Sequence, residues 1–366
     1  MGRESVRLFG RIVTLRERNT LAVLWTWLVL LLFLGVRMPD SGRSQSLPVA
    51  GQVIGHSILK AFSTTGSGGT TLAQAPEVIF QDRSGEMWLG GITGLFTLTA
   101  NDAKWQNRSD SLRVTGWFWV HGVGQDKRGD IWIWYGSGGS EFAYRAAGKW
   151  CDPREICPAS IKSLGRILIP GKDGRIWFAS SEGLVAYDGT KWDGPFNPPE
   201  REVQDYIRFR PAYPAVGQSR FSVPPASISV DERSLRYWAS DAYSGIQDRD
   251  GDIWVGSERG IWRFSEKRGD WSLYTTQGLA WRVARIFEDR YGKLWFTDAT
   301  GRLAQYDKVS ASWARYDLAS RFPGEHVQVL SVYAQNPRSV ILGTQPGVII
   351  LDERTGSMLP VPVHSG

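Results

Sequence analysis

The chain has 366 residues, enough for one large domain or two ordinary ones, and it combines 18 Trp and 41 Gly with only 2 Cys and 4 His. The net charge of +6 falls to +3 beyond residue 20, because residues 1–20 carry five Arg against Glu4 and Glu17. So small an excess of positive charge excludes the strongly basic surface that is typical of a nucleic-acid-binding protein. Abundant aromatic residues and glycine favour many strands and tight turns.

The N-terminal segment has the features of a membrane-targeting signal. A basic arm at residues 1–20 precedes the uncharged apolar run LAVLWTWLVLLLFLGV at residues 21–36. No small-x-small cleavage site follows, so residues 21–38 are predicted to be a helical signal anchor, with a cleaved signal peptide as the alternative. The arginine excess predicts a cytoplasmic arm and an extracytoplasmic remainder. Residues 39–75 are predicted to be a linker, with strands that help close a ring as a further possibility.

From residue 76 onward one pattern recurs, Asp-x-x-Gly-x-x-Trp. Its Trp position is occupied by Trp88, Trp132, Trp177, Trp254, Trp295 and, in a weaker sixth copy, Ile341. The third copy has Gly171 at the Asp position. A glycine stands six residues after every one of these positions, at Gly94, Gly138, Gly183, Gly260, Gly301 and Gly347. A second tryptophan follows in five copies, at Trp105, Trp150, Trp192, Trp271 and Trp313.

This unit predicts four short antiparallel strands joined by tight turns. Its second strand is apolar at three successive positions, as in Ile253-Trp254-Val255, so both faces of the sheet must be covered. Sheets packed radially against their neighbours meet that demand, and residues 76–366 are therefore predicted to be an all-β β-propeller. Asp248 is expected to hold its turn through its own carboxylate, Gly251 to supply backbone freedom, and Trp254 to fill the space between blades. The spacing disfavours a calcium loop, since Arg259 stands where the twelfth-position Glu would be.

The number of blades stays open at six or seven. Successive Trp or Ile positions are 44, 45, 77, 41 and 46 residues apart. The long interval contains residues 195–243, which form either a Pro-rich insertion or a degenerate blade. Seven is favoured, because the exported length divided by about 45 residues per blade gives that number.

Asp-x-x-Gly-x-x-Trp followed by a second glycine resembles the two-component regulator propeller repeat over roughly residues 76–352. That family forms the extracytoplasmic sensor part of bacterial hybrid histidine kinases, and many of its members bind glycans. The resemblance implies a periplasmic, N-terminally anchored sensor that acts in signal transduction, with a histidine kinase or another protein as partner. The chain contains no kinase and no second apolar span, so it is either a stand-alone anchored propeller or a fragment of a longer sensor.

A ligand is expected on the face that carries the second-glycine turns and the connections between blades. Aromatic planes beside polar groups suit an oligosaccharide or a similar small polar molecule. The alternative is that the aromatic residues only pack the blades. The predicted ligand-binding residues are Trp117, Trp119, Trp238, Tyr243, Trp281, Arg282 and His326.

Two other classes of function stay possible. Residues 291–307, YGKLWFTDATGRLAQYD, also resemble the repeat of streptogramin-lyase-type propellers, which are metal-dependent enzymes. Within the repeats at residues 76–352, however, only His121 and His326 are histidines, and neither has an acid or a second His at metal-ligand spacing. A protein-interaction scaffold is the other class. We predict no catalytic residue, no metal ligand and no cofactor, and we leave open whether Cys151 and Cys157 form a disulfide.

Overall fold

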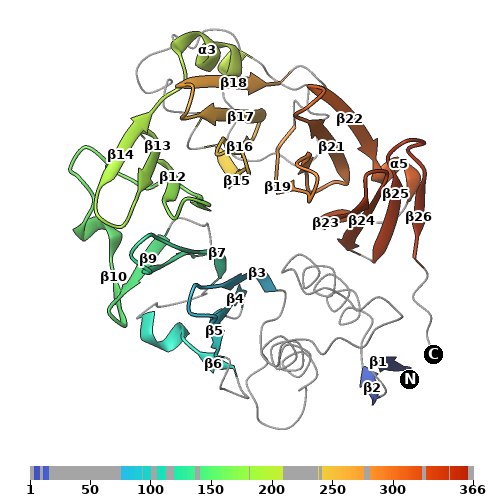
Figure 1. Ribbon diagram of the computed structural model, residues 1–366, viewed down its shortest axis with the longest axis horizontal. Helices are drawn as coiled ribbons and strands as arrows, with labels where there is room; N and C mark the ends of the chain where they lie inside the picture. The colour runs from blue at the N-terminus through green and yellow to red at the C-terminus, as the bar shows by residue number, and fades with distance from the viewer. Residues whose placement is uncertain are drawn as a thin grey trace, which may run out of the picture.

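The computed structural model of the protein describes most of the region that follows residue 75. The described residues are 4–8, 11–15, 76–92, 94–99, 105–112, 119–136, 141–180, 182–208, 238, 241–275, 281–323, 327–345 and 347–361. Within them, six four-stranded antiparallel sheets follow one another around a common axis (Figure 1). The predicted all-β propeller of four-stranded blades is confirmed.

Each sheet is one blade, and its strands follow in chain order from the axis outward. Blade 1 comprises β3 (Pro76–Gln81), β4 (Met87–Gly91), β5 (Gly94–Leu98) and β6 (Gln106–Asn107). Blade 2 comprises β7 (Val120–Gln125), β8 (Ile131–Tyr135), β9 (Glu141–Ala146) and β10 (Lys149–Cys151). Blade 3 comprises β11 (Leu168–Pro170), β12 (Ile176–Ser180), β13 (Gly183–Tyr187) and β14 (Trp192–Phe196). Blade 4 comprises β15 (Ala242–Gln247), β16 (Ile253–Ser257), β17 (Gly260–Ser265) and β18 (Asp270–Tyr274). Blade 5 comprises β19 (Arg285–Glu288), β20 (Leu294–Thr297), β21 (Arg302–Asp307) and β22 (Ser312–Asp317). Blade 6 comprises β23 (Gln328–Asn336), β24 (Ser339–Gln345), β25 (Val348–Asp352) and β26 (Met358–Pro360).

Short helices lie in the connections between strands. They are η1 (Ser109–Leu112), η2 (Pro153–Glu155), α3 (Glu200–Arg208) and α5 (Leu318–Arg321). Near the N-terminus, β1 (Glu4–Leu8) pairs with β2 (Arg11–Leu15) in a separate two-stranded sheet. The predicted signal anchor at residues 21–38 and the linker at 39–75 lie outside the described residues. No helix in the described part of the chain is long and apolar enough to cross a bilayer.

The preference for seven blades is not supported, because the described residues form six. The long interval between Trp177 and Trp254 holds no further blade, since the inner strands β11 and β15 contact each other directly. Part of that interval forms α3 instead, which contacts the outer strand β18 of blade 4. Dividing the chain length by the average number of residues per blade overestimates the number of blades when some residues form a helical connection.

The Asp-x-x-Gly turn is confirmed, and its carboxylate does more than the sequence predicted. One oxygen of Asp248 accepts hydrogen bonds from the backbone N–H groups of Asp250 and Asp252 at 2.9 and 3.0 Å. Its other oxygen accepts the indole N–H of Trp254 at 2.9 Å. The glycine of this turn, Gly251, has a φ of 91°. Asp82 and Trp88, Asp126 and Trp132, and Asp289 and Trp295 repeat the carboxylate–indole bond at 2.9–3.0 Å.

Each repeat tryptophan packs against the next blade. Trp88 of blade 1 belongs to the same apolar cluster as Ile131 and Ile133 of blade 2. Trp254 packs in the same way with Phe296 of blade 5, at a ring distance of 5.8 Å. All five repeat tryptophans are completely buried. Burying a side chain of this size stabilises the fold by about 2–3 kcal/mol, so these indoles hold successive blades together.

A glutamine before the Asp links neighbouring turns. Gln125 of blade 2 accepts the backbone N–H of Arg83 in blade 1 at 2.9 Å and donates to its own Gly129 carbonyl at 3.0 Å. The guanidinium of Arg83 also donates to the carbonyl of Lys127 at 3.0 Å. Gln247 of blade 4 makes the matching bond to the backbone N–H of Lys172 in blade 3. Polar bonds at the turns thus supplement the indole packing.

Blade 3 departs from this scheme because Gly171 replaces the aspartate. The indole N–H of Trp177 is buried without a hydrogen-bond partner. Asp173 caps the turn instead, accepting the backbone N–H of Arg175 at 3.0 Å. The guanidinium of Arg175 lies 4.6 Å from the centre of the Trp177 ring, which gives the indole a cation–π contact.

We predict that Asp126→Ala destabilises the propeller by about 3–5 kcal/mol, because several buried donors lose their only charged acceptor. The measurement is equilibrium unfolding in urea. Asp352→Ala is the matched control, since Asp352 also caps two backbone N–H groups, at 2.9 Å, but holds no indole. Equal losses for the two variants would contradict the role of the indole bond.

Introducing the aspartate of the repeat into blade 3 is expected to destabilise the protein. A Cβ added at Gly171 would lie 2.7 Å from the carbonyl oxygen of Arg175, which is backbone and cannot turn away. Gly171→Asp should therefore lower the urea midpoint, at a cost of about 1–3 kcal/mol, although it matches the pattern of the other blades. A raised midpoint would show that the turn can open to seat a carboxylate below Trp177.

Candidate functional site

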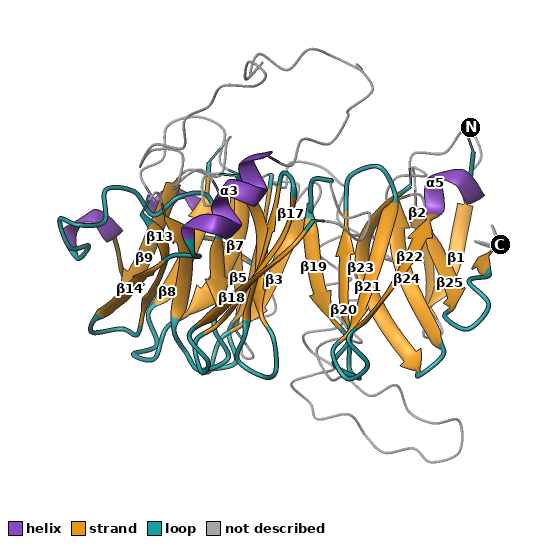
Figure 2. Cartoon of the chain, turned by 90° about the horizontal axis from the view of Figure 1, so that it is seen from above, coloured by secondary structure: helices purple, strands orange, loops and turns teal. Residues whose placement is uncertain are grey.

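The propeller has two unlike faces. The Asp-x-x-Gly turns lie on one, and the second-glycine turns and the connections between blades lie on the other, which we call the connection face. The helices α3 and α5, which belong to two of these connections, lie along this face (Figure 2). It is the face on which the sequence predicts a ligand.

The predicted site residues differ in how far they are buried. Trp119, Tyr243 and Arg282 are only partly buried or are exposed on this face. Trp238 and Trp281 are instead 0% and 3% exposed and belong to apolar clusters. Trp117 and His326 lie outside the described residues. The binding role of the whole set therefore stays a prediction, and its described, accessible part is smaller than expected.

Trp119 belongs to a stacked group at the start of blade 2. The imidazole of His121 lies between the rings of Trp119 and Trp134, with a centroid distance of 5.0 Å to each. One ring nitrogen of His121 is 3.0 Å from the Glu77 carboxylate of blade 1, and the other is 2.9 Å from the carbonyl of Gly136. Two aromatic planes and a carboxylate thus meet where blades 1 and 2 adjoin.

Tyr243 and Arg282 form a second group, between blades 4 and 5. The guanidinium carbon of Arg282 lies 3.7 Å from the centre of the Tyr243 ring, and its Nε is 3.6 Å from the Glu258 carboxylate. Burial, followed by the charge of Glu258, raises the pKa of Tyr243, so its hydroxyl stays a donor. The side chain of Arg282 is 52% exposed, which leaves guanidinium N–H groups accessible to a ligand.

Next to this pair lies a carboxyl that the sequence analysis did not single out. The hydroxyl of Tyr206, on α3, donates to Asp241 at 3.3 Å, and the guanidinium of Arg259 lies 5.6 Å from the Tyr206 ring centre. Burial raises the pKa of Asp241 above its usual range, while Arg259 acts in the opposite direction. Sequence offers one signal for this group, the Glu258-Arg259 pair directly before the second glycine of blade 4.

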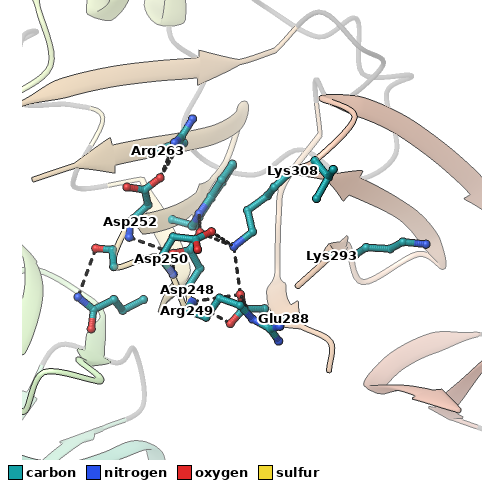
Figure 3. Close-up of polar contacts among 12 residues, drawn as sticks. Asp248, Arg249, Asp250, Asp252, Arg263, Glu288, Lys293 and Lys308 are labelled. Carbon is teal, nitrogen blue, oxygen red and sulfur yellow. Dashed lines mark hydrogen bonds and ion pairs between the residues drawn. The ribbon is translucent and has the colours of Figure 1, made fainter. Parts of the chain in front are cut away.

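The opposite face carries a dense ionic cluster around Glu288, at the end of β19 (Figure 3). Lys172, Arg249 and Lys308 approach its carboxylate at 2.6, 3.1 and 3.2 Å. Burial acts to raise the pKa of Glu288, but these cations hold it below its usual range. Lys308 also pairs with Asp248 and Asp250 at 3.1 and 2.6 Å. Because positive and negative groups balance, this cluster joins blades 3, 4 and 5 rather than offering a charged site.

No group of three or more His, Cys, Asp or Glu side chains that could hold a metal ion occurs in the described part of the chain. Cys151 and Cys157 are both free thiols. Burial raises the pKa of Cys157 to about 11, which disfavours its reactive thiolate.

No protein-family model matches the sequence, and no curated protein matches it either. Similar solved structures include the extracellular domain of the putative one-component system BT4673 from B. thetaiotaomicron, at 15% identity and a TM-score of 0.46. That match covers 79% of this chain and 36% of the other, so the chain spans about a third of that domain. A virginiamycin B lyase from Staphylococcus aureus, with quinupristin, matches at 12% identity and a TM-score of 0.48, over 78% of this chain and 80% of the lyase.

A third similar structure is YCF48 from Cyanidioschyzon merolae, at 13% identity and a TM-score of 0.49, over 80% of this chain and 87% of that one. The extracellular domain of a putative one-component system and a lyase thus both occur among the similar structures. Because one fold can carry unrelated activities, function has to be argued from the side chains.

The raised pKa of Asp241 predicts a specific pH dependence. The folded protein holds this proton more tightly than the unfolded chain, whose Asp pKa is about 3.9. The resulting stabilisation is present below that value and is lost as pH rises through the folded pKa. Asp241→Asn avoids this loss, so its stability relative to wild type should increase from pH 4 to pH 7 in urea unfolding.

Asp188→Asn is the control, because the contribution of Asp188 to stability depends on pH in the opposite direction. Hydrogen bonds from the backbone of Lys191 and the hydroxyl of Thr190 lower the pKa of Asp188 to about 2. Its stabilisation is therefore present above pH 4 and lost towards pH 2. A difference between Asp241→Asn and wild type that does not vary with pH would contradict the assignment.

Proposed function

We propose that the propeller is an extracytoplasmic sensor domain that binds an oligosaccharide or a similarly polar small ligand on its connection face and acts in signal transduction. The single observation that carries this proposal is that partly exposed aromatic planes lie beside ionic groups in two places on one face. These are the Trp119–His121–Trp134 stack with Glu77, and the Tyr243–Arg282 pair with Glu258.

The chemistry of both groups suits sugar rings. Aromatic faces contact the apolar C–H side of a sugar, while carboxylate and guanidinium groups bond its hydroxyls. The groups sit at the starts of inner strands or in connections, where the rigid blades hold them in place. We propose a binding role, with no side chain assigned to catalysis.

The place in the cell is part of the same proposal. The basic arm followed by the apolar run at residues 21–36 supports N-terminal anchoring in a bacterial membrane with the propeller on the outer side. The resemblance of the repeat to two-component regulator propellers supports coupling to a histidine kinase or another signalling partner.

A protein-interaction scaffold is the second candidate. The burial of Trp238 and Trp281 favours it, because two of the aromatic planes expected to contact a sugar are taken up by packing. Capture of a protein partner without any response to small ligands would select this candidate.

The expected result for the sensor is a rise in melting temperature with at least one member of a broad glycan panel. A ligand at 100 times its Kd stabilises a protein by about 2.7 kcal/mol. Trp119→Ala and Arg282→Gln should each reduce the shift at fixed ligand concentration.

Tyr291→Ala is the matched control, since Tyr291 is a partly exposed aromatic residue in the Asp-x-x-Gly turn of blade 5, on the other face. The proposal is overturned by the absence of any shift across the panel, or by a shift that both connection-face variants leave intact.

A further inference from the structure

A groove of about 250 Å³ lies at the outer rim, where blade 5 meets blade 6. One wall is the end of β22 with α5, and the other is the turn that leads into β26. The lining residues are Arg315, Tyr316, Asp317, Ser320, Arg321, Gly356 and Met358. None of them belongs to the two connection-face groups described above.

The groove is rich in hydrogen-bond donors that lack acceptors. The guanidiniums of Arg315 and Arg321 make no hydrogen bond or ion pair within the described part of the chain, and the Tyr316 hydroxyl also has no partner there. Burial, followed by the charges of Glu353 and Asp352, raises the pKa of Tyr316 to about 12, so its hydroxyl keeps its proton. By comparison, the guanidinium of Arg175 is paired with the Glu266 carboxylate at 2.8 Å.

The acceptors of the groove are already in use. The carboxylate of Asp317 accepts the backbone N–H of Ser320 at 3.2 Å. The hydroxyl of Ser320 donates to the carbonyl of Asp317 at 3.0 Å. The lining thus holds two guanidiniums and a phenol against one engaged carboxylate. The two further carboxylates whose charges act on Tyr316 are engaged as well, Glu353 with Lys293 and Asp352 with backbone N–H groups of its own turn. This surplus of donors over free acceptors favours an anionic, acceptor-rich ligand.

The floor of the groove is packed against the core and is partly apolar. The ring of Tyr316 stacks on the buried Trp295 at a centroid distance of 6.0 Å, and Met358 packs against the same core cluster. A Cβ added at Gly356 would meet nothing within 4 Å, so the backbone of this wall is open to approach. A ligand with a short apolar portion next to its charge would fit such a floor.

We propose that this groove binds a carboxylate group, with Arg315 and Arg321 as cationic partners and the Tyr316 hydroxyl as a further donor. The carboxylate could come from a free dicarboxylate or from an acidic side chain of a peptide. This site is separate from the connection face, so it stands or falls independently of the sensor proposal.

The test is isothermal titration calorimetry of the full chain with two probes, succinate and the peptide acetyl-Glu-Leu-Glu-Glu-amide. Saturable binding of either probe is expected, and the one that binds more tightly identifies the source of the carboxylate. Arg321→Gln should weaken binding at least tenfold. Tyr316→Phe, which keeps the ring stack on Trp295, should weaken it about threefold. Raising the salt concentration from 50 to 300 mM should weaken it further, because the groove is open to solvent.

Two controls separate this site from general attraction to a basic protein. Arg201→Gln removes an exposed arginine from α3, which packs on blade 4, and should leave binding unchanged. Acetyl-Gln-Leu-Gln-Gln-amide should not bind. The proposal is wrong if neither anionic probe binds at 10 mM, if the neutral peptide binds equally well, or if Arg201→Gln weakens binding as much as Arg321→Gln does.

Discussion

The bond between a buried carboxylate and an indole N–H is the interaction on which the propeller depends. Asp82, Asp126, Asp248 and Asp289 are at most 9% exposed, so each charge must be stabilised within the protein. Backbone N–H groups of the turn supply part of that stabilisation and the indole supplies the rest. One side chain thereby fixes the shape of a turn and the orientation of the largest side chain in the interface with the next blade. Local turn chemistry and long-range packing are thus coupled through two oxygen atoms.

The two faces of the propeller follow from this arrangement. On the turn side, Gln125 and Gln247 tie neighbouring blades together, and the cluster around Glu288 joins three of them. Polar groups on that side are satisfied by one another. On the connection face the chain must pass from one blade to the next, and polar and aromatic side chains there, such as Trp119 and Arg282, stay partly accessible. A rigid scaffold suits the recognition role that we propose for the connection face.

Departures from the repeat are compensated by nearby charges. In blade 3, where Gly171 leaves the Trp177 indole without an acceptor, Arg175 covers the ring and pairs with Glu266 of blade 4. In blade 5, Glu288 occupies the place that Gln125 and Gln247 hold in blades 2 and 4, and its extra charge is met by Lys172 and Lys308. The rim groove differs, because the cations Arg315 and Arg321 have no such compensation among the described residues. That contrast is what makes it a candidate for an external anion.

The sequence by itself determined the repeat, the four strands of each blade and the Asp-x-x-Gly turn, because these depend on residues that lie within one repeat of the sequence. Only the tertiary structure decided the number of blades, since that depends on whether β11 touches β15 across a long interval. It also decided which aromatic residues are accessible. Trp119, Trp238 and Trp281 all precede a blade in the sequence, yet Trp238 is buried in an apolar cluster with Tyr206 of α3 and Trp262, and Trp281 is buried in one with Trp254 and Ile286. Burial of this kind comes from contacts between distant segments, and no local pattern encodes it.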